Sequence, residues 1–367
     1  MYARVKMAKN VKAKETEEKY VAYVSSYTSG LGSDYGIRIY DVDLKKGRLT
    51  EKQKVEITNS SYIGIAHNKK TLYSITDEGV EAYHIEKDGS LKFLNEASIN
   101  GMRGCYVNMD QQDNYLITAG YHDGKVTILK LNKDGSIGEI TDERYHKGLG
   151  TAAGRNHVPH VQCIKVSKDN QYLLAADLGM DRVNVYKLDL ETGKIKEVDV
   201  IHCDQESSPR HMQFSKDGKF LYVCLEQKCA IEVYEYVDNN GDPDFNKVQS
   251  VSCSDESDSL GVASSALTFS EDYNYLVSST AGENNVIVFK VDKDTGLLTK
   301  LIQLPVAGEY PKDAALFPDN KHLVSLNHES DSMTFFHVDM KAGTIVMNGP
   351  ELPIPRPNCI VFHQLED

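Results

Sequence analysis

Short runs of alternating apolar and polar residues dominate the chain, and clusters of turn-forming residues separate these runs. Segment 208–227, SPRHMQFSKDGKFLYVCLEQ, shows the pattern most clearly. Residues 210–215 and 220–225 are typical of two strands, and residues 216–218 are typical of the turn between them. Helical periodicity of any length is absent. The pattern therefore predicts an all-β chain that is built from hairpins.

The hairpin recurs along the chain. In each copy, a short strand and a turn precede a second strand, which opens with an aromatic or polar residue and then an aliphatic one. These opening pairs are Tyr20-Val21, Thr71-Leu72, Tyr115-Leu116, Tyr172-Leu173, Phe220-Leu221, Tyr275-Leu276 and His322-Leu323. Their spacings of 51, 44, 57, 48, 55 and 47 residues bracket the ~40–50 residues of a propeller blade. A β-rich strand and a more polar strand follow each pair, so each unit supplies four strands.

The seventh copy of the first strand is missing from the front of the chain and stands at its end, as residues 358–363. If that strand pairs with residues 20–25, the first and last units form one blade and the ring closes without open sheet edges. The sequence therefore predicts a seven-bladed β-propeller with four antiparallel strands per blade. Residues 20–367 form this single domain, and residues 1–19 are expected to be a flexible or short helical lead-in.

Charge and composition narrow the range of partners. The formal charge is −13 and the body of the chain has no basic run, which argues against nucleic acid and against an anionic membrane surface. No apolar stretch approaches the ~20 residues that span a bilayer, and the first residues lack the apolar core of a signal peptide. Seven scattered cysteines without CxxC pairs are typical of reduced thiols. We expect a cytoplasmic protein that is a monomer or a weak homodimer.

The hairpin geometry predicts which residues meet at the central channel. Residues equally far from the turn of a hairpin lie side by side, and in a propeller they share one rim of the channel. The expected pairs are Ser61 with Asp77, Cys105 with Tyr121, Gln162 with Leu178, Arg210 with Glu226, Ser265 with Ala281, Lys312 with His328, and Asn358 with Ser26. Register errors of one or two residues add Arg103, His122, His160, Asp177, Asn327 and Arg356 to the candidates.

Arg210 with Glu226 is the one predicted pair that joins a strong cation to a carboxylate. Glu226 can act as a general base on water while Arg210 stabilises charge on a carbonyl oxygen. His160 is the alternative base, because imidazole titrates near neutrality. The competing interpretation is a plain salt bridge within one blade. Cations from several blades suit a small anion such as a phosphate or carboxylate. HExxH, GxSxG and zinc-type Cys/His spacings are absent from the sequence, so no metal or cofactor is expected.

Three segments carry a resemblance to a known family: AGYHDGKVTIL, VPHVQCIKVSKDNQYLLAADLGMDRVNVY and SPRHMQFSKDGKFLYVCLEQ, with the closing PNCIVFH. They resemble the bacterial lactonase family of seven-bladed propellers, whose namesake is propeller-type 6-phosphogluconolactonase. The resemblance extends over nearly the whole chain after about residue 19. It implies hydrolysis, without a metal, of 6-phospho-glucono-1,5-lactone to 6-phosphogluconate in the pentose phosphate pathway.

A related fungal propeller, carboxymuconate lactonizing enzyme, has a proposed site of a His, two Arg and a Glu. By position, the resemblance places the first Arg on Arg210 and the Glu on Glu226. The second His of the family's Pro-His-x-His segment is Gln162 here, and the second Arg is Ala281. Because Gln cannot exchange protons at neutral pH, either His160 or Glu226 supplies the base, or the chemistry of this member is altered.

The leading hypothesis is a sugar-lactone hydrolase with Glu226, Arg210 and His160 as catalytic residues. The expected substrate-binding residues are Gln162, Arg103, Tyr121, His122, Asp177, Lys312 and His328. A second hypothesis, motivated by Gln162 and Ala281, is a non-catalytic propeller that binds a small anionic ligand or a protein partner. A third is a muconate-type cycloisomerase, and the missing second Arg weighs against it.

Overall fold

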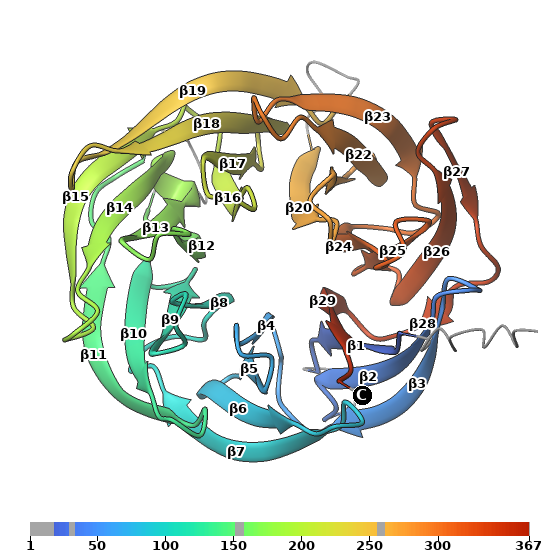
Figure 1. Ribbon diagram of the computed structural model, residues 1–367, viewed down its shortest axis with the longest axis horizontal. Helices are drawn as coiled ribbons and strands as arrows, with labels where there is room; N and C mark the ends of the chain where they lie inside the picture. Colours follow the sequence, from blue (N-terminus) through green and yellow to red (C-terminus); the bar gives the residue numbers. More distant parts are fainter. Residues whose placement is uncertain (1–17, 29–33, 151–157, 255–260, 367) are drawn as a thin grey trace, which may run out of the picture.

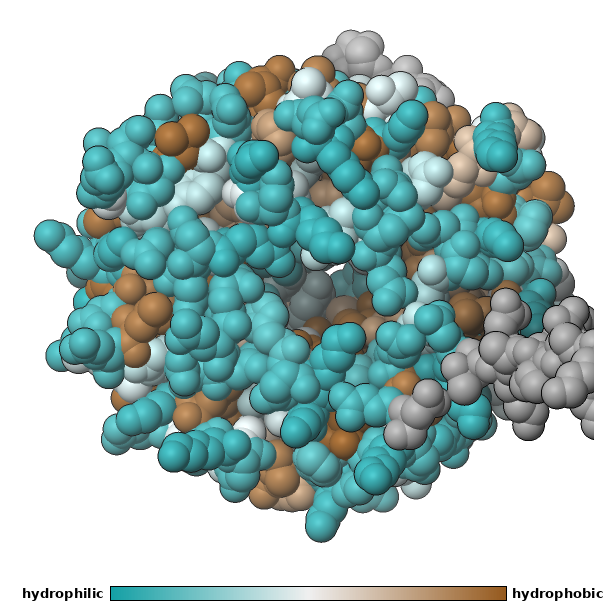
Figure 2. Space-filling model, viewed as in Figure 1, coloured by the Kyte–Doolittle hydropathy of each residue, from teal (hydrophilic) through white to brown (hydrophobic). Residues whose placement is uncertain are grey.

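The computed structural model describes residues 18–28, 34–150, 158–254 and 261–366. Seven antiparallel sheets stand around a common axis as the blades of a ring (Figure 1). The face of the ring seen in Figure 2 has a recess at its centre. Six sheets have four strands, and the seventh has five because β28 (Leu352–Pro353) also pairs with its third strand. The predicted seven-bladed β-propeller is confirmed.

Each blade runs from an inner strand at the channel to an outer strand at the rim of the ring. The innermost strands are β4 (Ile63–Ile65), β8 (Tyr106–Met109), β12 (Val161–Val166), β16 (Pro209–Phe214), β20 (Ala263–Phe269), β24 (Pro311–Leu316) and β29 (Pro357–Gln364). The second strands are β5 (Thr71–Ile75), β9 (Tyr115–Gly120), β13 (Tyr172–Asp177), β17 (Phe220–Leu225), β21 (Tyr275–Ala281), β25 (His322–Asn327) and β1 (Tyr20–Ser26). Each second strand begins at the residue that the sequence repeat marked.

Two more strands complete each blade. The third strands are β6 (Gly79–Ile85), β10 (Lys125–Leu131), β14 (Arg182–Leu188), β18 (Ala230–Asp238), β22 (Asn285–Val291), β26 (Ser332–Asp339) and β2 (Ile37–Asp43). The outer strands are β7 (Leu91–Ser98), β11 (Ile137–Tyr145), β15 (Ile195–His202), β19 (Pro243–Ser252), β23 (Leu298–Pro305), β27 (Thr344–Met347) and β3 (Arg48–Val55). Within the described ranges, η2 (Leu178–Met180) is the one helical element, and no helix there is long and apolar enough to cross a membrane.

The two ends of the chain close the ring. β29 pairs with β1 in antiparallel register, with Val21 opposite His363 and Tyr23 opposite Val361. The sheet order β29-β1-β2-β3 therefore combines the last strand of the chain with the first three. This closure, predicted from the displaced seventh repeat, leaves no open sheet edge between the first and last blades.

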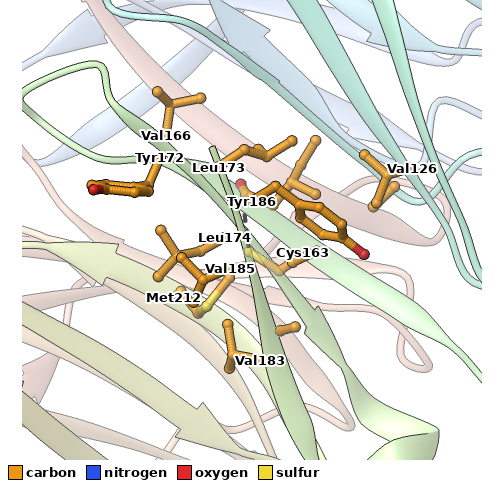
Figure 3. Packing of buried hydrophobic residues seen from close by; sticks show 14 of the residues in the cluster. Val126, Cys163, Val166, Tyr172, Leu173, Leu174, Val183, Val185, Tyr186 and Met212 are labelled. Atoms are coloured by element: carbon orange, nitrogen blue, oxygen red, sulfur yellow. Dashed lines mark hydrogen bonds between the residues drawn. The ribbon is translucent and has the colours of Figure 1, made fainter. Parts of the chain in front are cut away.

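The core lies between neighbouring blades. Second strands such as β13 and β17 are buried along their whole length, because each sheet is covered on both faces by its neighbours. Figure 3 shows this packing, in which Val126 of one blade and Met212 of another join Cys163 and Leu174 in the same cluster. Burial of each such aliphatic side chain stabilises the fold by ~1.5–3 kcal/mol. After a buried first residue, outer strands such as β7 and β19 are exposed or half-buried, as expected for strands at the solvated rim.

β-Bulges interrupt four innermost strands at the same height in the ring. The pairing of β12, β16, β24 and β29 with their second strands skips one residue, which is Gln162, Arg210, Lys312 and Asn358 respectively. A bulged residue leaves the regular ladder, so its side chain is re-aimed relative to those of its neighbours. All four side chains line one cavity on the axis of the ring.

Candidate active site

A cavity of about 370 Å³ lies on the propeller axis, at the end of the channel where the innermost strands begin. Six of the seven blades contribute to its wall. The lining residues are Tyr27, Ser61, Tyr62, Arg103, Gly104, Cys105, Tyr121, His122, Gln162, Arg210, His211, Glu226, Tyr310, Lys312, Asp313 and Asn358. The cavity has the size and the mixture of aromatic and polar groups that are typical of a small-molecule site.

The inner-strand members of the seven predicted rim pairs are placed at or beside this cavity. Six of them line it: Ser61, Cys105, Gln162, Arg210, Lys312 and Asn358. The seventh, Ser265, lies outside the lining and donates its hydroxyl to the backbone oxygen of Lys312 at 2.8 Å. The geometric argument from the hairpins therefore located the cavity, while the roles of its residues stay predictions.

Arg210 and Glu226 form a buried ion pair at the wall of the cavity. Their exposed fractions are 8% and 5%, and the Nη1 group of Arg210 donates to Oε2 of Glu226. Burial opposes the charge of Arg210, but Glu226 offsets this effect and raises the pKa of the guanidinium, so Arg210 stays cationic. A guanidinium carries five N–H donors, and within the described part of the chain Glu226 is the acceptor that Arg210 meets. Its Nε is buried without a hydrogen-bond partner among the described residues, so the Nη groups are the ones that can reach a ligand in the cavity.

The backbone before Arg210 is fixed by Asp181, which follows η2 in the preceding blade. One carboxylate oxygen accepts from the amide of Ser208 at 2.8 Å, and the other accepts from the amide of Glu206 at 2.8 Å. On the other side of the hairpin, the amide of Glu226 donates to the carbonyl of Ser208 at 2.8 Å. These hydrogen bonds fix the positions of Arg210 and Glu226 along the axis of the cavity.

Two further cations lie beside Tyr27 in the cavity wall. The guanidinium of Arg103 is 5.0 Å from the ring centre of Tyr27, and Nζ of Lys312 is 4.5 Å from it. Arg103 is also paired with Asp77 at 2.9 Å, while Nζ of Lys312 donates to Oδ1 of Asn358 at 2.7 Å. Burial lowers the pKa of Lys312 to about 7, and the positive charges of Arg210 and Arg103 act in the same direction. The cavity is therefore electropositive in a protein of net charge −13.

His160 does not line the cavity, although it was the expected alternative base. Its Nδ1 donates to the backbone oxygen of Tyr121 at 2.6 Å, and its ring stacks on that of Tyr121 with centroids 4.2 Å apart. Tyr121 lines the cavity in its place. His160 is thus placed behind the lining, where it supports Tyr121.

Asp177 was expected to bind substrate, but the structure buries it completely. One carboxylate oxygen accepts from Nδ1 of His146 at 2.7 Å, and the other accepts from the backbone amide of His160 at 2.9 Å. Nε2 of His146 in turn meets the hydroxyl of Tyr186 at 2.9 Å. Both oxygens of Asp177 are committed to protein groups, so its position indicates a structural role, and its role in substrate binding stays a prediction.

His328 also lies behind the lining rather than in it. Nδ1 donates to the backbone oxygen of Pro357 at 3.1 Å, and the ring packs edge-on against Tyr27 and Tyr310 at 5.5 and 5.8 Å. Burial, followed by the charge of Lys312, lowers the pKa of His328 to about 4. His328 is therefore a neutral packing residue outside the lining, and its role as a substrate ligand stays a prediction.

The remaining second-strand members of the predicted pairs fall into two groups. Asp77 reaches the site only through Arg103, whereas Ser26, Leu178 and Ala281 are buried outside the lining. The other candidates, Asn327 and Arg356, are likewise absent from the lining. Among the described residues, the blade of β20 therefore contributes no cation to the lining.

The sequence analysis missed several cavity residues, most notably His211 and Asp313. Each follows a bulged residue, so two consecutive side chains of one strand face the axis, which strict alternation of strand residues would not predict. Burial, then the charge of Arg210, holds the pKa of His211 well below its usual range, whereas burial raises the pKa of Asp313 to about 7. The loop residues Tyr27 and Tyr310 had no signal in the repeat pattern.

Cys105 lines the cavity but is a poor nucleophile. Burial raises the pKa of its thiol to about 12, so the thiolate is scarce at neutral pH. Its Sγ donates to the backbone oxygen of Val161 at 3.3 Å. A thioester mechanism therefore has no support from this site.

Comparisons with known proteins agree with the fold. Residues 21–362 match the family model described as lactonase, 7-bladed beta-propeller. The chain is 31% identical to a 6-phosphogluconolactonase of Bacillus subtilis, over 95% of this chain and 99% of that protein. It is 26% identical to a 6-phosphogluconolactonase of Formosa agariphila, over 87% and 93% of the two chains. The solved structure of the periplasmic gluconolactonase PpgL of Pseudomonas aeruginosa superimposes with a TM-score of 0.87 at 25% identity, covering 95% of this chain and all of that one.

Proposed function

Since the chain belongs to the lactonase family of seven-bladed β-propellers, we propose that it is a carboxylic ester hydrolase that opens a sugar lactone in the central cavity. The substrate that we propose is 6-phospho-glucono-1,5-lactone, and the product is 6-phosphogluconate, as in the pentose phosphate pathway. The relatives that are named 6-phosphogluconolactonase support this substrate.

The observation that carries the proposal is the convergence of Arg103, Arg210 and Lys312 on one cavity. Arg103 and Arg210 are permanent cations, and Lys312 adds a third positive charge whenever it is protonated. Two carboxyl groups, Glu226 and Asp313, share the lining, but Glu226 is paired with Arg210. An electropositive pocket on an acidic protein favours a substrate with a phosphate group.

Arg210 is placed to stabilise the transition state. When water attacks C1 of the lactone, the carbonyl oxygen becomes an oxyanion, and fixed N–H donors that face it lower the barrier. Glu226 holds the guanidinium in one orientation, so little reorganisation is needed at the moment of reaction. We therefore assign Glu226 the role of orienting Arg210, and Arg210 that of the oxyanion ligand.

The other lining residues divide between the phosphate and the sugar hydroxyls. The side chain of Arg103 is more exposed (28%) than that of Arg210 (10%), and its partner Asp77 is partly exposed, so Arg103 is the proposed phosphate ligand. His122 lies beside it and is neutral near pH 7, because burial and the charge of Arg103 lower its pKa. Gln162 supplies an amide group that can donate to and accept from hydroxyl groups, whereas the amide of Asn358 is bonded to Lys312 and to the backbone oxygen of Ser60.

Kinetics with two lactones test the proposal. Freshly prepared 6-phosphogluconolactone and unphosphorylated glucono-1,5-lactone are compared, each corrected for spontaneous hydrolysis. We expect kcat/KM to favour the phosphorylated lactone by at least ~10-fold, since a charge-assisted contact contributes ~1.5–3 kcal/mol. A rate equal to that in buffer for both lactones would contradict the proposal, and a preference for the unphosphorylated lactone would contradict the choice of substrate.

Gln162 and Ala281 differ from the residues that the resemblance implies at these positions. They therefore favour a second candidate function, a propeller that binds a sugar phosphate without hydrolysing a lactone. It predicts saturable binding of 6-phosphogluconate by calorimetry with no lactone hydrolysis. A cytoplasmic location and a monomeric or weakly dimeric state remain predictions, and the Pseudomonas relative is described as periplasmic.

A further inference from the structure

Hydrolysis in this cavity requires a group that takes a proton from water. His160 lies behind Tyr121 and outside the lining. Glu226 is paired with Arg210. His211, although it lines the cavity, has a pKa held so low by burial and by Arg210 that it is a weak base. The carboxyl oxygens of Asp313, which also lines the cavity, accept from the backbone amides of Ala314 and Ile360. Neither the bases expected from the sequence nor His211 and Asp313 therefore account for the proton acceptor.

Lys312 occupies the position that this role requires. It is the bulged residue of β24, at the same height as Arg210 in β16 and Gln162 in β12, so its amine shares the cavity with the guanidinium that would hold the oxyanion. The backbone of Lys312 is fixed by the hydroxyl of Ser265 at 2.8 Å, and its Nζ is directed by Oδ1 of Asn358 at 2.7 Å.

We propose that Lys312 is the general base of the reaction: its neutral amine takes a proton from the attacking water while Arg210 receives the developing oxyanion. This assignment rests on the proposed lactone hydrolysis and adds the residue that performs its proton transfers. It goes beyond the expectation that Lys312 binds the phosphate or the hydroxyl groups of the substrate.

The surroundings of Lys312 favour the neutral amine. Its Nζ faces the ring of Tyr27 and the amide of Asn358, and no carboxylate among the described residues lies within salt-bridge distance of it. Two guanidinium groups in the same cavity repel its charge, and burial removes water from it, so its pKa falls to about 7. The charged and titratable groups that face it from the surrounding elements are Arg103, Cys105, Arg210, His211, His328 and Glu329.

The proposed hydrolysis proceeds in two steps, in which every proton and every electron pair is accounted for. In the first, a bond forms between the water oxygen and C1, the carbonyl π electrons move to oxygen, and one water proton passes to Nζ of Lys312. In the second, the oxyanion collapses, the bond between C1 and the ring oxygen breaks, and Nζ returns that proton to the ring oxygen, which becomes a hydroxyl group. Lys312 ends neutral, and the new carboxylic acid releases its own proton to solvent.

Two variants separate a base from a simple cation. Lys312→Arg keeps the positive charge but cannot be deprotonated, and Lys312→Gln keeps hydrogen bonding without charge or basicity. The matched control is Lys165→Arg, which changes a lysine on the inner strand β12 outside the cavity lining. Folding is checked by thermal unfolding, and the integrity of the site by the Kd for 6-phosphogluconate.

Hydrolysis of 6-phosphogluconolactone is measured between pH 5.5 and 9. We expect kcat of the wild type and of Lys165→Arg to rise with pH through about 7. For Lys312→Arg we expect kcat to fall at least ~100-fold, KM and the product Kd to change less than ~3-fold, and the rise near pH 7 to disappear. Lys312→Gln is expected to lose kcat to the same extent.

The proposal is overturned if Lys312→Arg keeps kcat within ~5-fold of the wild type and keeps the same pH profile, or if the defect of Lys312→Gln is confined to KM. Either result would make Lys312 a cationic ligand of the substrate. If Lys312→Arg does not fold, Lys312→Gln alone decides between the two roles. Failure of the proposed function itself looks different, because the wild type would then show no hydrolysis above the spontaneous rate.

Discussion

The guanidinium of Arg210 donates a hydrogen bond to the carboxylate of Glu226, 16 residues later in the chain, across the β16–β17 hairpin and at the wall of the central cavity. Both side chains are almost fully buried. A buried charge depends on its partner for compensation, because removal of one member leaves the other unpaired in a medium of low dielectric constant. The pair is therefore expected to matter for stability as well as for catalysis.

We predict that Glu226→Gln lowers the free energy of unfolding by about 3–5 kcal/mol and lowers kcat/KM by ~10- to 100-fold, because Arg210 loses its fixed orientation. Urea unfolding and the lactone assay measure the two effects. Glu235→Gln is the control, since it changes an exposed glutamate in the third strand of the same sheet. A Glu226→Gln variant with wild-type stability and activity would show that the ion pair contributes to neither.

The position of Arg210 and Glu226 could be predicted from sequence because a hairpin has one local rule: residues equally far from the turn face each other. Because the hairpin repeats in every blade, the same rule could be applied to each copy. It correctly predicted that Gln162, Lys312 and Asn358 lie at the cavity as well. The rule needs no knowledge of neighbouring blades, which explains its success for inner strands.

The same rule was less successful at the ends of the second strands, where Tyr121 and Glu226 are the two predicted pair members that line the cavity. There the chain turns toward the third strand, and packing between blades decides where a side chain points. Asp177 and His328 are therefore turned into the space behind the lining, where protein groups satisfy them. His211 was missed for a different reason, because the bulge at Arg210 cancels the alternation on which sequence patterns depend.

The structural role of Asp177 leads to a second prediction. The carboxylate of Asp177 accepts one hydrogen bond from His146 and another from the backbone amide of His160. In Asp177→Asn, the side-chain amide has one oxygen and can accept only one of the two. We expect a loss of about 2–4 kcal/mol of stability with KM changed less than ~3-fold in the folded fraction. Asp294→Asn, at an exposed turn, is the control. A large rise in KM at unchanged stability would restore Asp177 as a substrate ligand.

The chemistry of Cys105 gives a third prediction. Since burial raises the pKa of its thiol to about 12, iodoacetamide should label it slowly at pH 7.5, and Cys105→Ser should keep kcat within ~3-fold of the wild type. Mass spectrometry of the labelled peptide and the lactone assay check the two parts. Rapid labelling with parallel loss of activity would instead indicate a reactive thiol in the reaction path.

Asp313 gives a prediction about the pH dependence of stability. Its pKa is raised from 3.8 to about 7 by burial, so between these values the folded state binds more protons than the unfolded state does. The free energy of unfolding that Asp313 contributes is fully present below pH 4 and is lost as pH rises through about 7.

Asp313→Asn removes this titration, so its Tm relative to the wild type should be higher at pH 8 than at pH 5. Thermal unfolding of both proteins at the two pH values gives the difference in Tm between variant and wild type at each pH. The titration of all other groups is common to the two proteins and cancels from this difference to first order. A Tm difference that is the same at both pH values would show that Asp313 is ionised throughout this range.

The account as a whole depends on Arg210 acting on the substrate in the central cavity. The most direct measurement is the rate of 6-phosphogluconolactone hydrolysis, corrected for the spontaneous reaction, by the wild type, Arg210→Lys and Arg210→Ala. We predict clear catalysis by the wild type, a loss of at least ~100-fold in kcat for Arg210→Ala, and a loss nearly as large for Arg210→Lys, because lysine cannot reproduce the guanidinium fork. Catalysis by Arg210→Ala at the wild-type rate would contradict the proposed site, and a wild-type rate equal to that in buffer would contradict the proposed function.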